Sequence, residues 1–354
     1  MAILIDDIHY NSRRIDGYNV PFNFIVSERE AGKTTWIVMK KLYQSFKDGH
    51  TSLILRRQIT DITDVYIEDF AKLINKFSDD NVKFTYKKSS LKDGLVDVYI
   101  GEKENAKLFV RIVALSNPIN RIKSTMLPNI KYLLFDEFIC NPEFQEKYLP
   151  AEATRFKEIY NTYQRETSML KCYFIGNPYS DYNPYYVWLG VDTNKLKRGT
   201  IQRGINWAVE KYEITKELRE SILAKNPLYQ FDDSYTRYAL NGEAVNDANI
   251  KLSTLKENYR LKFVFRIDGK YLGCFQNNYL EDRADKYFIK VVDNVSAKRC
   301  IYCFDFNQLV DRTCLMSLND KYMFNRFKIA MRKRQVEFET IECYYLMIEI
   351  YNNL

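Results

Sequence analysis

The run Ala31-Gly32-Lys33-Thr34-Thr35 has the residue types and the order that bind a phosphate chain. A glycine lets the backbone approach the phosphates, a lysine spans the outer two, and a hydroxyl ligates Mg²⁺. Gly32, Lys33 and Thr34 would take these three roles. The helix predicted to begin here would point its positive end at the phosphates. The run therefore predicts a nucleotide-binding loop.

The first half of this loop departs from the usual phosphate-loop pattern. Ser27 stands where that pattern has glycine, and the charged run Glu28-Arg29-Glu30 follows it. Ser27 can replace glycine if its backbone angles stay in the ordinary regions. Taken alone, this loop is weak evidence for nucleotide binding, and a chance Gly-Lys-Thr is the alternative.

A second motif lies further along the chain, where an apolar run at 133–135 ends in Asp136 and Glu137. This is the pattern of a Walker B strand, in which the aspartate holds Mg²⁺. Glu137 is placed to orient and deprotonate the attacking water. A buried strand that ends in two acidic residues is common by itself. Both motifs together favour a nucleoside triphosphatase that uses ATP and Mg²⁺.

Asn177 ends the next predicted strand, in the run YFIGNP. A polar side chain there can sense the γ-phosphate and pass its state onward. Asn177 and Pro178 also have the composition of a plain turn. The residues alone leave both interpretations open.

The segments around these motifs predict the elements that position them. Apolar runs at 23–26 and 51–57 indicate strands, and the run 34–48 between them has helical periodicity. This order predicts a βαβ unit with its turn at the phosphate loop. Further helices are expected at 64–77 and 152–166, and further strands at 96–101, 107–115, 130–139 and 170–178.

The composition of the chain changes from about residue 200. Residues 200–255 are polar and rich in asparagine, with a helical stretch at 213–225, and we interpret them as a linker or lid. A meander is expected from 256 onward: a hairpin at 259–275 with its turn at Asp268-Gly269, strands at 286–292 and 300–306, and a helical end at 325–354. The sequence thus predicts an α/β protein with domains at 1–199 and 256–354 joined by 200–255.

The totals suit a globular protein. The 354 residues are 46% hydrophobic and 15% aromatic, which excludes a disordered chain. The chain has no apolar run long enough to span a membrane, and its charged N-terminus lacks the apolar core of a signal peptide, so we expect neither a spanning nor a secreted protein. The net charge of +7 permits a polyanionic partner without requiring one.

Cysteine usage suits a reducing compartment, because the seven cysteines are an odd number scattered over a long chain. Cys300 and Cys303 have metal-ligand spacing but lie in a predicted strand. Residues three apart on a strand point to opposite faces, so they cannot share a metal. The two histidines, His9 and His50, lie far upstream, and we expect two buried thiols rather than a zinc site.

These motifs resemble those of the DNA-packaging ATPases of φ29-like tailed bacteriophages, relatives of the large-terminase motors. The family's degenerate loop carries an arginine that Arg29 matches, and its Walker B run reads almost as FDEFI, which residues 135–139 reproduce. The similarity is strong over 23–190 and loose beyond 256. The remaining matches are Lys123-Ser124, Pro128-Asn129, Arg165-Glu166, Asn177, Asn183-Pro184-Tyr185 and the hairpin KFVFRIDGKYLGCF.

The resemblance implies a P-loop ATPase domain of the ASCE (RecA-like or terminase-like) class with a mainly parallel sheet. It also implies a small helical linker and a C-terminal α+β domain that resembles ribonuclease H. Such proteins form a homomeric ring, a pentamer, that uses ATP and Mg²⁺ to drive double-stranded DNA through the portal of a preformed capsid. The setting is the host cytoplasm, transiently on the procapsid, and a structural packaging RNA is a further candidate partner.

The resemblance also assigns roles to residues. Thr34 and Asp136 would ligate Mg²⁺, and Glu137 would activate water. Arg165 would reach the neighbouring subunit's γ-phosphate as a trans-acting finger, and Lys123 is a second candidate in trans. Arg29 joins these residues in the catalytic set. The residues assigned to ATP binding are Ser27, Glu28, Arg29, Glu30, Ala31, Gly32, Lys33, Thr34, Thr35 and Asp136.

The C-terminal part offers weaker signals. Its densest basic cluster could contact DNA, the portal or an RNA, or it could be a solvated helix face; it consists of Arg326, Lys328, Arg332, Lys333 and Arg334. A nuclease needs carboxylates that converge on metals, whereas the aspartates here are spread without an obvious shared face, so we expect a vestigial, inactive nuclease. These aspartates are Asp268, Asp293, Asp305 and Asp311. The alternatives are a large terminase with an active nuclease, a helicase-type ATPase, and a structural ring component.

Overall fold

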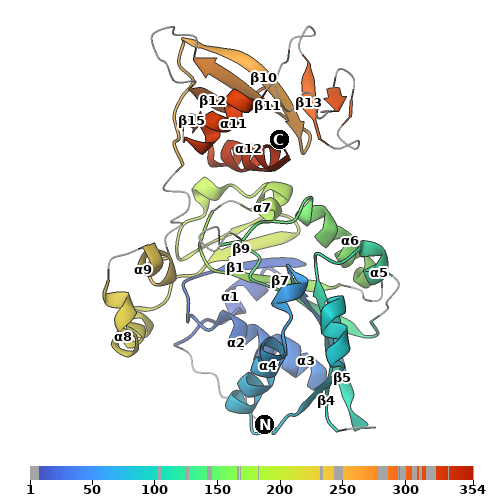
Figure 1. Cartoon of the computed structure of the whole chain (residues 1–354). Coiled ribbons are helices and arrows are strands. Elements are labelled where there is room, and N and C mark those ends of the chain that lie inside the picture. Colours follow the sequence, from blue (N-terminus) through green and yellow to red (C-terminus); the bar gives the residue numbers. More distant parts are fainter. Residues whose placement is uncertain are drawn as a thin grey trace. The chain divides into compact units, whose positions relative to one another are not determined.

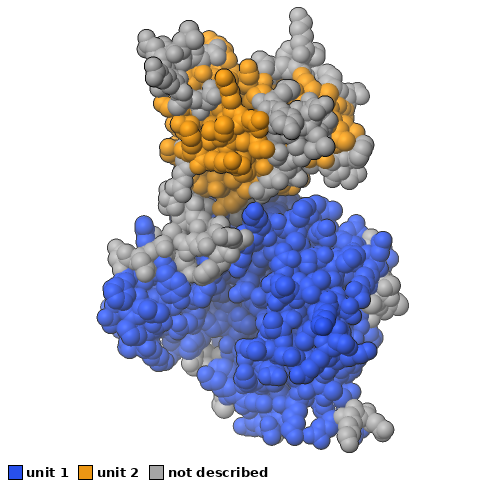
Figure 2. Space-filling model, viewed as in Figure 1, with its two compact units in different colours: residues 1–245 blue, residues 246–354 orange. Residues whose placement is uncertain are grey.

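The computed structural model divides the chain into two compact units, residues 1–245 and residues 246–354 (Figure 2). The residues it describes are 8–102, 105–123, 127–141, 146–165, 167, 169–181, 183–231, 234–242, 250–277, 286–293, 295, 300–304, 309–310, 313–315, 324–333 and 335–353. Among them, no helix has the length and apolar character needed to cross a membrane.

The first unit is built on a nine-stranded sheet in the order β3-β4-β5-β2-β6-β7-β1-β9-β8. Its strands are β1 (Phe22–Val26), β2 (Thr51–Arg56), β3 (Phe84–Tyr86), β4 (Leu95–Ile100), β5 (Lys107–Ala114), β6 (Ile130–Asp136), β7 (Lys171–Gly176), β8 (Thr200–Arg203) and β9 (Trp207–Lys211). The adjacent strands β5-β2-β6-β7-β1-β9 all run parallel to one another. At the two edges of the sheet, β4 pairs with β5, β3 with β4, and β8 with β9 in antiparallel fashion. The mainly parallel sheet predicted from the sequence is confirmed.

Helices cover both faces of this sheet (Figure 1). They are α1 (Arg13–Asp16), α2 (Lys33–Ile37), the π-helical η1 (Val38–Tyr43), α3 (Gln44–Lys47), α4 (Asp64–Phe77), α5 (Ile119–Lys123), α6 (Glu152–Gln164), α7 (Pro184–Leu189), α8 (Lys216–Lys225) and α9 (Ser234–Ala239). Short 3₁₀ helices are η2 (Ile59–Asp61), η3 (Lys88–Asp93), η6 (Thr193–Lys195) and η7 (Pro227–Gln230). The helices predicted around 34–48, 64–77 and 152–166 are confirmed.

Alternating side chains of each strand enter two separate cores. In β1, Phe24 packs with α6 and α7 on one face, whereas Ile25 packs with α2, η1 and α4 on the other. Both side chains are fully buried, as expected for a parallel strand with helices on both sides. Because the central strands are parallel, their carboxyl ends meet at one edge of the sheet, where the site residues gather.

The predicted boundary at 199/200 is wrong. Residues 200–211 form β8 and β9, and β9 pairs in parallel with β1, the strand before the phosphate loop. Residues further on, including Ile214, Leu218 and Tyr229, are buried in the same core as β1 and β6. The polar composition of 200–255 concealed this, because an edge hairpin and its following helices bury only some of their residues.

The second unit has a six-stranded sheet in the order β14-β13-β10-β11-β12-β15. Its elements are β10 (Tyr259–Ile267), β11 (Lys270–Asn277), β12 (Tyr287–Val291), β13 (Ile301–Cys303), β14 (Thr313–Leu315), α11 (Asn325–Arg332), β15 (Val336–Phe338) and α12 (Ile341–Asn353). The predicted hairpin is confirmed, and Asp268 and Gly269 at its turn both take positive φ, +48° and +76°. Two such residues between strands suit the twist of a tight hairpin.

Two sequence expectations for this unit are corrected by the structure. The helical end predicted at 325–354 is interrupted by β15, which pairs in parallel with β12. Val336 and Phe338 are buried there, so strand pairing overrides the local periodicity. The expectation of two buried thiols is wrong for Cys300, which precedes β13 and is exposed, whereas Cys303 lies in β13 and is buried.

Candidate functional site

The phosphate loop connects β1 to the helix that begins at Lys33. Gly32 has φ +89°, a conformation that residues with a Cβ rarely adopt. A Cβ there would also lie only 3.0 Å from the Cβ of His9, so the space favours glycine as well. Ser27 does not take a positive φ, which explains why glycine is dispensable at that position. Glu30 does take one, +58°. The unusual first half of the loop is therefore compatible with a phosphate-loop fold.

Lys33 is buried at the centre of this loop. Its Nζ donates to the carbonyl oxygens of Ser27 (3.0 Å) and Glu28 (2.9 Å) and to Oδ1 of Asn177 (3.4 Å). Burial lowers the pKa of Lys33 to about 8, although Glu28 and Asp136 act in the opposite direction. A lysine held in this way places a positive charge where phosphates would lie.

The two motifs meet at one edge of the sheet. β6, which ends in Asp136, is separated from β1 by β7, and β7 ends just before Asn177. Beside them lies a cavity of about 730 Å³. The predicted site residues that line it are Arg29, Glu30, Ala31, Gly32, Lys33, Thr34, Thr35, Asp136, Glu137 and Asn177. Ser27 and Glu28 contribute through their contacts with Lys33.

Two residues that the sequence reasoning missed hold the Walker B carboxylates. Arg56, at the end of β2, donates to Oδ2 of Asp136 (3.0 Å) and to Oε2 of Glu137 (2.7 Å), and Tyr66 of α4 donates to the same Asp136 oxygen (3.3 Å). Burial raises the pKa of Asp136, and Arg56 opposes this shift. The position of Arg56 as the last residue of an apolar parallel strand was the signal that could have identified it.

Thr34 and Asp136 fit a magnesium ion bound together with phosphates. A hydroxyl and a carboxylate, both facing the same cavity, are oxygen ligands of the kind that Mg²⁺ takes. Glu137 also lines the cavity, and its side chain is 57% exposed, so water can reach it. The arrangement can hold a nucleoside triphosphate together with a metal ion, and it can place the carboxylate of Glu137 beside the outer phosphate.

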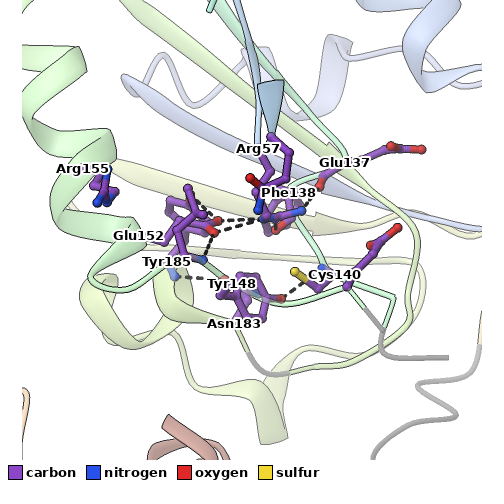
Figure 3. Close-up of polar contacts among 12 residues, drawn as sticks. Arg57, Glu137, Phe138, Cys140, Tyr148, Glu152, Arg155, Asn183 and Tyr185 are labelled. Carbon is purple, nitrogen blue, oxygen red and sulfur yellow. Dashed lines mark hydrogen bonds and ion pairs between the residues drawn. The ribbon is translucent and has the colours of Figure 1, made fainter. Parts of the chain in front are cut away.

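A buried cluster lies behind Glu137 (Figure 3). Arg57 donates to the backbone carbonyls of Glu137 (3.1 Å) and Phe138 (2.6 Å) and forms an ion pair with Glu152 at 3.0 Å. Tyr185 donates to the other carboxylate oxygen of Glu152 (2.9 Å). Burial opposes the charge of Arg57, but Glu152, Cys140, Tyr148 and Tyr185 together outweigh it, and the pKa of Arg57 lies above its ordinary value.

The charged first half of the loop is held by the segment after β7. Glu28 is fully buried and forms an ion pair with Arg198. Glu30 accepts a hydrogen bond from Tyr229 (3.2 Å). No sequence pattern indicated Arg198 and Tyr229 as partners, because they lie far along the chain and belong to no motif.

Arg29 has its own contacts with that segment. Its guanidinium donates to Tyr179 (2.9 Å) and lies 5.7 Å from the ring centre of Tyr235. Its backbone N–H donates to the carbonyl of Ala239 (2.9 Å). Arg29 therefore lines the cavity from a fixed position.

The remaining predicted residues lie elsewhere. Arg165 is exposed at the end of α6 and does not line the cavity, and the side chain of Lys123 lies outside the described residues. In the second unit, α11 carries Arg326, Lys328 and Arg332, and Lys333 follows it. Arg334 lies outside the described residues.

The chain matches a known protein family over nearly its whole length. The podovirus DNA encapsidation protein family (Gp16) matches residues 5–354. The chain belongs to this family. Its resemblance to the packaging proteins of φ29-like phages, predicted from the motifs, is confirmed.

Relatives in the encapsidation family are distant in sequence. The chain is 22% identical over 325 residues to the DNA packaging protein of Bacillus phage phi29, covering 91% of this chain and 90% of the relative. It is 23% identical over 326 residues to that of Bacillus phage B103, covering 91% and 94%.

Solved structures of packaging motors share the fold. The Phi-28 gp11 DNA packaging motor superposes with a TM-score of 0.67 at 17% identity, covering 95% of both chains. A chain of the bacteriophage Phi-29 viral genome packaging motor assembly gives 0.63 at 18% identity, covering 98% of this chain and 99% of that one.

Proposed function

We propose that this protein is the ATP-hydrolysing subunit of a motor that packages double-stranded viral DNA. One observation carries the proposal: in a chain of the encapsidation family, Lys33, Asp136 and Glu137 face a single cavity at the carboxyl edge of a parallel sheet. These are the groups that bind the phosphates, hold the metal and activate water in P-loop ATPases.

Each residue has a role that its position supports. Lys33 binds the outer phosphates, and Thr34 and Asp136 would hold Mg²⁺, which would supply positive charge to the phosphates. Glu137 accepts a proton from the attacking water. Asn177, in contact with Lys33, responds to the γ-phosphate.

We further propose that the subunits act as a homomeric ring, a pentamer on the portal, with ATP between neighbours. Arg165 ends α6 shortly before β7 begins at Lys171, whereas the phosphate loop follows the carboxyl end of β1. Because β1 and β7 are parallel, Arg165 lies toward the opposite edge of the sheet from its own loop. This position suits a finger that serves the neighbouring subunit, and Lys123 is a second candidate in trans.

The second unit is proposed to be a vestigial nuclease that resembles ribonuclease H. Its meander β10-β11-β12 with a parallel pair, β13 and β14, beside β10 supports this fold. The central strand β10 reads YRLKFVFRI and has no carboxylate for a metal. Asp305 and Asp311 lie outside the described residues. The basic residues of α11 are candidate contacts for DNA, the portal or a structural RNA.

The test is steady-state ATP hydrolysis as a function of protein concentration, with and without linear double-stranded DNA. We expect the rate per subunit to rise with concentration and with DNA, because a shared site is complete only between subunits. A rate that is flat in both would contradict the motor, and no hydrolysis at all would contradict the ATPase. Metal-dependent cleavage of plasmid DNA would instead favour a large terminase with an active nuclease.

The same assay isolates Arg165. Arg165→Ala should bind ATP normally yet hydrolyse it poorly, since a finger contributes roughly 10³ to 10⁵ in rate in GTPases. Mixing it with Lys33→Ala subunits should restore some turnover, because the two variants together complete one shared interface. Normal hydrolysis by Arg165→Ala alone would contradict the finger role.

A further inference from the structure

The backbone at Glu137 takes a strained conformation just past the end of β6. Its φ is +59°, a left-handed conformation that residues with a Cβ rarely adopt. β6 ends at Asp136, and beyond it the N–H of Phe138 still donates to the carbonyl of Ile175 in β7 (3.2 Å), which leaves the carbonyls of Glu137 and Phe138 to be held by a side chain. Phe138 turns back into the core, where its ring meets Phe24 and Phe174. The carboxylate of Glu137 is therefore presented from a single strained residue between two anchored ones.

Arg57 supplies that support. Its two terminal nitrogens donate to two successive carbonyls, those of Glu137 at 3.1 Å and Phe138 at 2.6 Å. Figure 3 shows the side chain of Glu137 directed away from Arg57 while its carbonyl faces the guanidinium. Arg57 thus holds the peptide groups that follow the strained residue and does not contact the carboxylate, which pairs with Arg56 and faces the cavity.

Arg57 is itself held by two helices. Its Nε donates to Glu152, the first residue of α6, and Tyr185 of α7 donates to the same carboxylate. All three side chains are buried. The guanidinium is also 5.2 Å from the ring centre of Tyr148. Arg57 reaches these acceptors with three different nitrogens of one rigid plane, whereas a lysine would have to bring them all to a single Nζ.

We propose that Arg57, oriented by Glu152 and Tyr185, is a positioning residue that sets the orientation of Glu137 for ATP hydrolysis. This inference rests on the proposed ATPase function. The network shares no residue with the contacts of Lys33, which are to Ser27, Glu28 and Asn177. Disturbing it therefore lowers the rate of hydrolysis and leaves ATP binding unchanged.

The experiment compares Arg57→Lys and Tyr185→Phe with a matched control, Tyr173→Phe. Tyr173 is also buried and donates to a carboxylate, Asp16 at 2.6 Å, but has no contact with the network. For each variant, kcat and the Kd of a fluorescent ATP analogue are measured. We expect Arg57→Lys to lower kcat about 100-fold, the order of effect of displacing a reacting group by about 1 Å. Tyr185→Phe should lower kcat by a smaller factor, and Tyr173→Phe should retain it.

A merely structural role gives a different pattern. It would weaken ATP binding together with turnover, and Tyr173→Phe would match Tyr185→Phe. A second readout is the residual rate of ATP hydrolysis in Glu137→Gln. Adding Arg57→Lys to this variant should lower the rate little further, because both changes remove the action of an oriented Glu137 carboxylate. Independent, multiplicative losses would overturn the proposal.

The outcomes separate this inference from the proposed function. If the wild-type protein does not hydrolyse ATP, both fail. If the wild type hydrolyses ATP and Tyr185→Phe and Arg57→Lys keep its kcat, the positioning role alone is overturned. If Arg57→Lys does not fold, Tyr185→Phe decides, since it removes one hydroxyl and keeps the ion pair.

Discussion

At the scale of single residues, the site depends on charges held away from water. Lys33 is buried beside the cavity and Asp136 is largely shielded there, with 12% of its side chain exposed. Burial lowers the pKa of Lys33 and raises the pKa of Asp136, which favours the neutral form of each. Hydrogen bonds and opposite charges offset this cost. Arriving phosphates and Mg²⁺ would compensate the same charges, so ligand binding and protonation are coupled.

This coupling predicts a pH dependence of ATP binding. The pKa of Lys33 is lowered from 10.5 to about 8, so the folded protein without nucleotide loses this proton as pH rises through about 8. ATP needs the charged form, and its affinity should fall by roughly tenfold between neutral pH and about pH 9. Titration of a fluorescent ATP analogue across this range measures the effect. An affinity that is constant over the range would contradict a lowered pKa.

The contribution of Lys33 to the stability of the fold should rise with pH, whereas the affinity for ATP should fall. Because the folded pKa of Lys33 is below the ordinary value, the unfolded chain binds more protons between about pH 8 and 10.5. The contribution of Lys33 to the free energy of unfolding therefore rises with pH in this window. The charge proposed to bind ATP therefore lowers the stability of the protein without nucleotide.

At the scale of elements, α7 is the short helix that carries Tyr185 into the buried cluster. Asn183 caps it, accepting from the N–H groups of Tyr185 (3.1 Å) and Tyr186 (3.0 Å), and Pro184 occupies the first turn. The cap side chain is fully buried. Sequence resemblance pointed to Asn-Pro-Tyr without a reason, and the helix cap is the physical reason.

Removal of this cap should destabilise the protein. Asn183→Ala loses both bonds to N–H groups inside the core, and we expect a loss of about 2 kcal/mol in the free energy of unfolding, the upper end for helix caps. Thr215→Ala is the matched control: Thr215 caps the exposed start of α8 through one bond to Leu218 N–H (3.2 Å) and should cost less. Urea unfolding of both variants gives the comparison. Equal losses would show that burial of the cap is unimportant.

At the scale of the whole molecule, each unit has its own core. The clusters around β1 and β6 involve residues up to Leu240, and the cluster around β10 begins with Ile250. Among the described residues, no core cluster includes side chains from both units. Each unit therefore buries enough of its own apolar surface to be considered a folding unit.

This organisation predicts where the chain can be cut. A chain of residues 1–245 should fold and bind ATP, because it keeps the whole nine-stranded sheet. A chain of residues 1–199 should not fold stably, since it loses β8 and β9, exposes the edge of β1 and removes the buried residues Val209, Ile222 and Tyr229. Far-UV circular dichroism and binding of the ATP analogue distinguish the two. Full ATP binding by residues 1–199 would contradict the view that β9 supports β1.

Much of the fold was predictable because its signals are local. The strands β1, β2, β6 and β7 are short apolar runs, and α4 has a clear helical period that the structure confirms at Asp64–Phe77. The linker boundary was not predictable from composition, since strand pairing of β9 with β1 is a long-range contact. Likewise, β15 forms only because β12 offers an edge to Val336 and Phe338.

The sequence by itself determined which residues are candidates for the chemistry of the site. The residues Gly32, Lys33, Asp136 and Glu137 are recognisable from type and spacing, because a phosphate loop and a Walker B strand are each continuous in the chain. The tertiary structure alone decided which residues hold them in place. Arg56 and Arg57 are adjacent in sequence, yet Arg56 contacts the carboxylates of Asp136 and Glu137, whereas Arg57 contacts two backbone carbonyls and the carboxylate of Glu152. Successive residues near the end of a strand face different ways, and their partners come from elements far away along the chain.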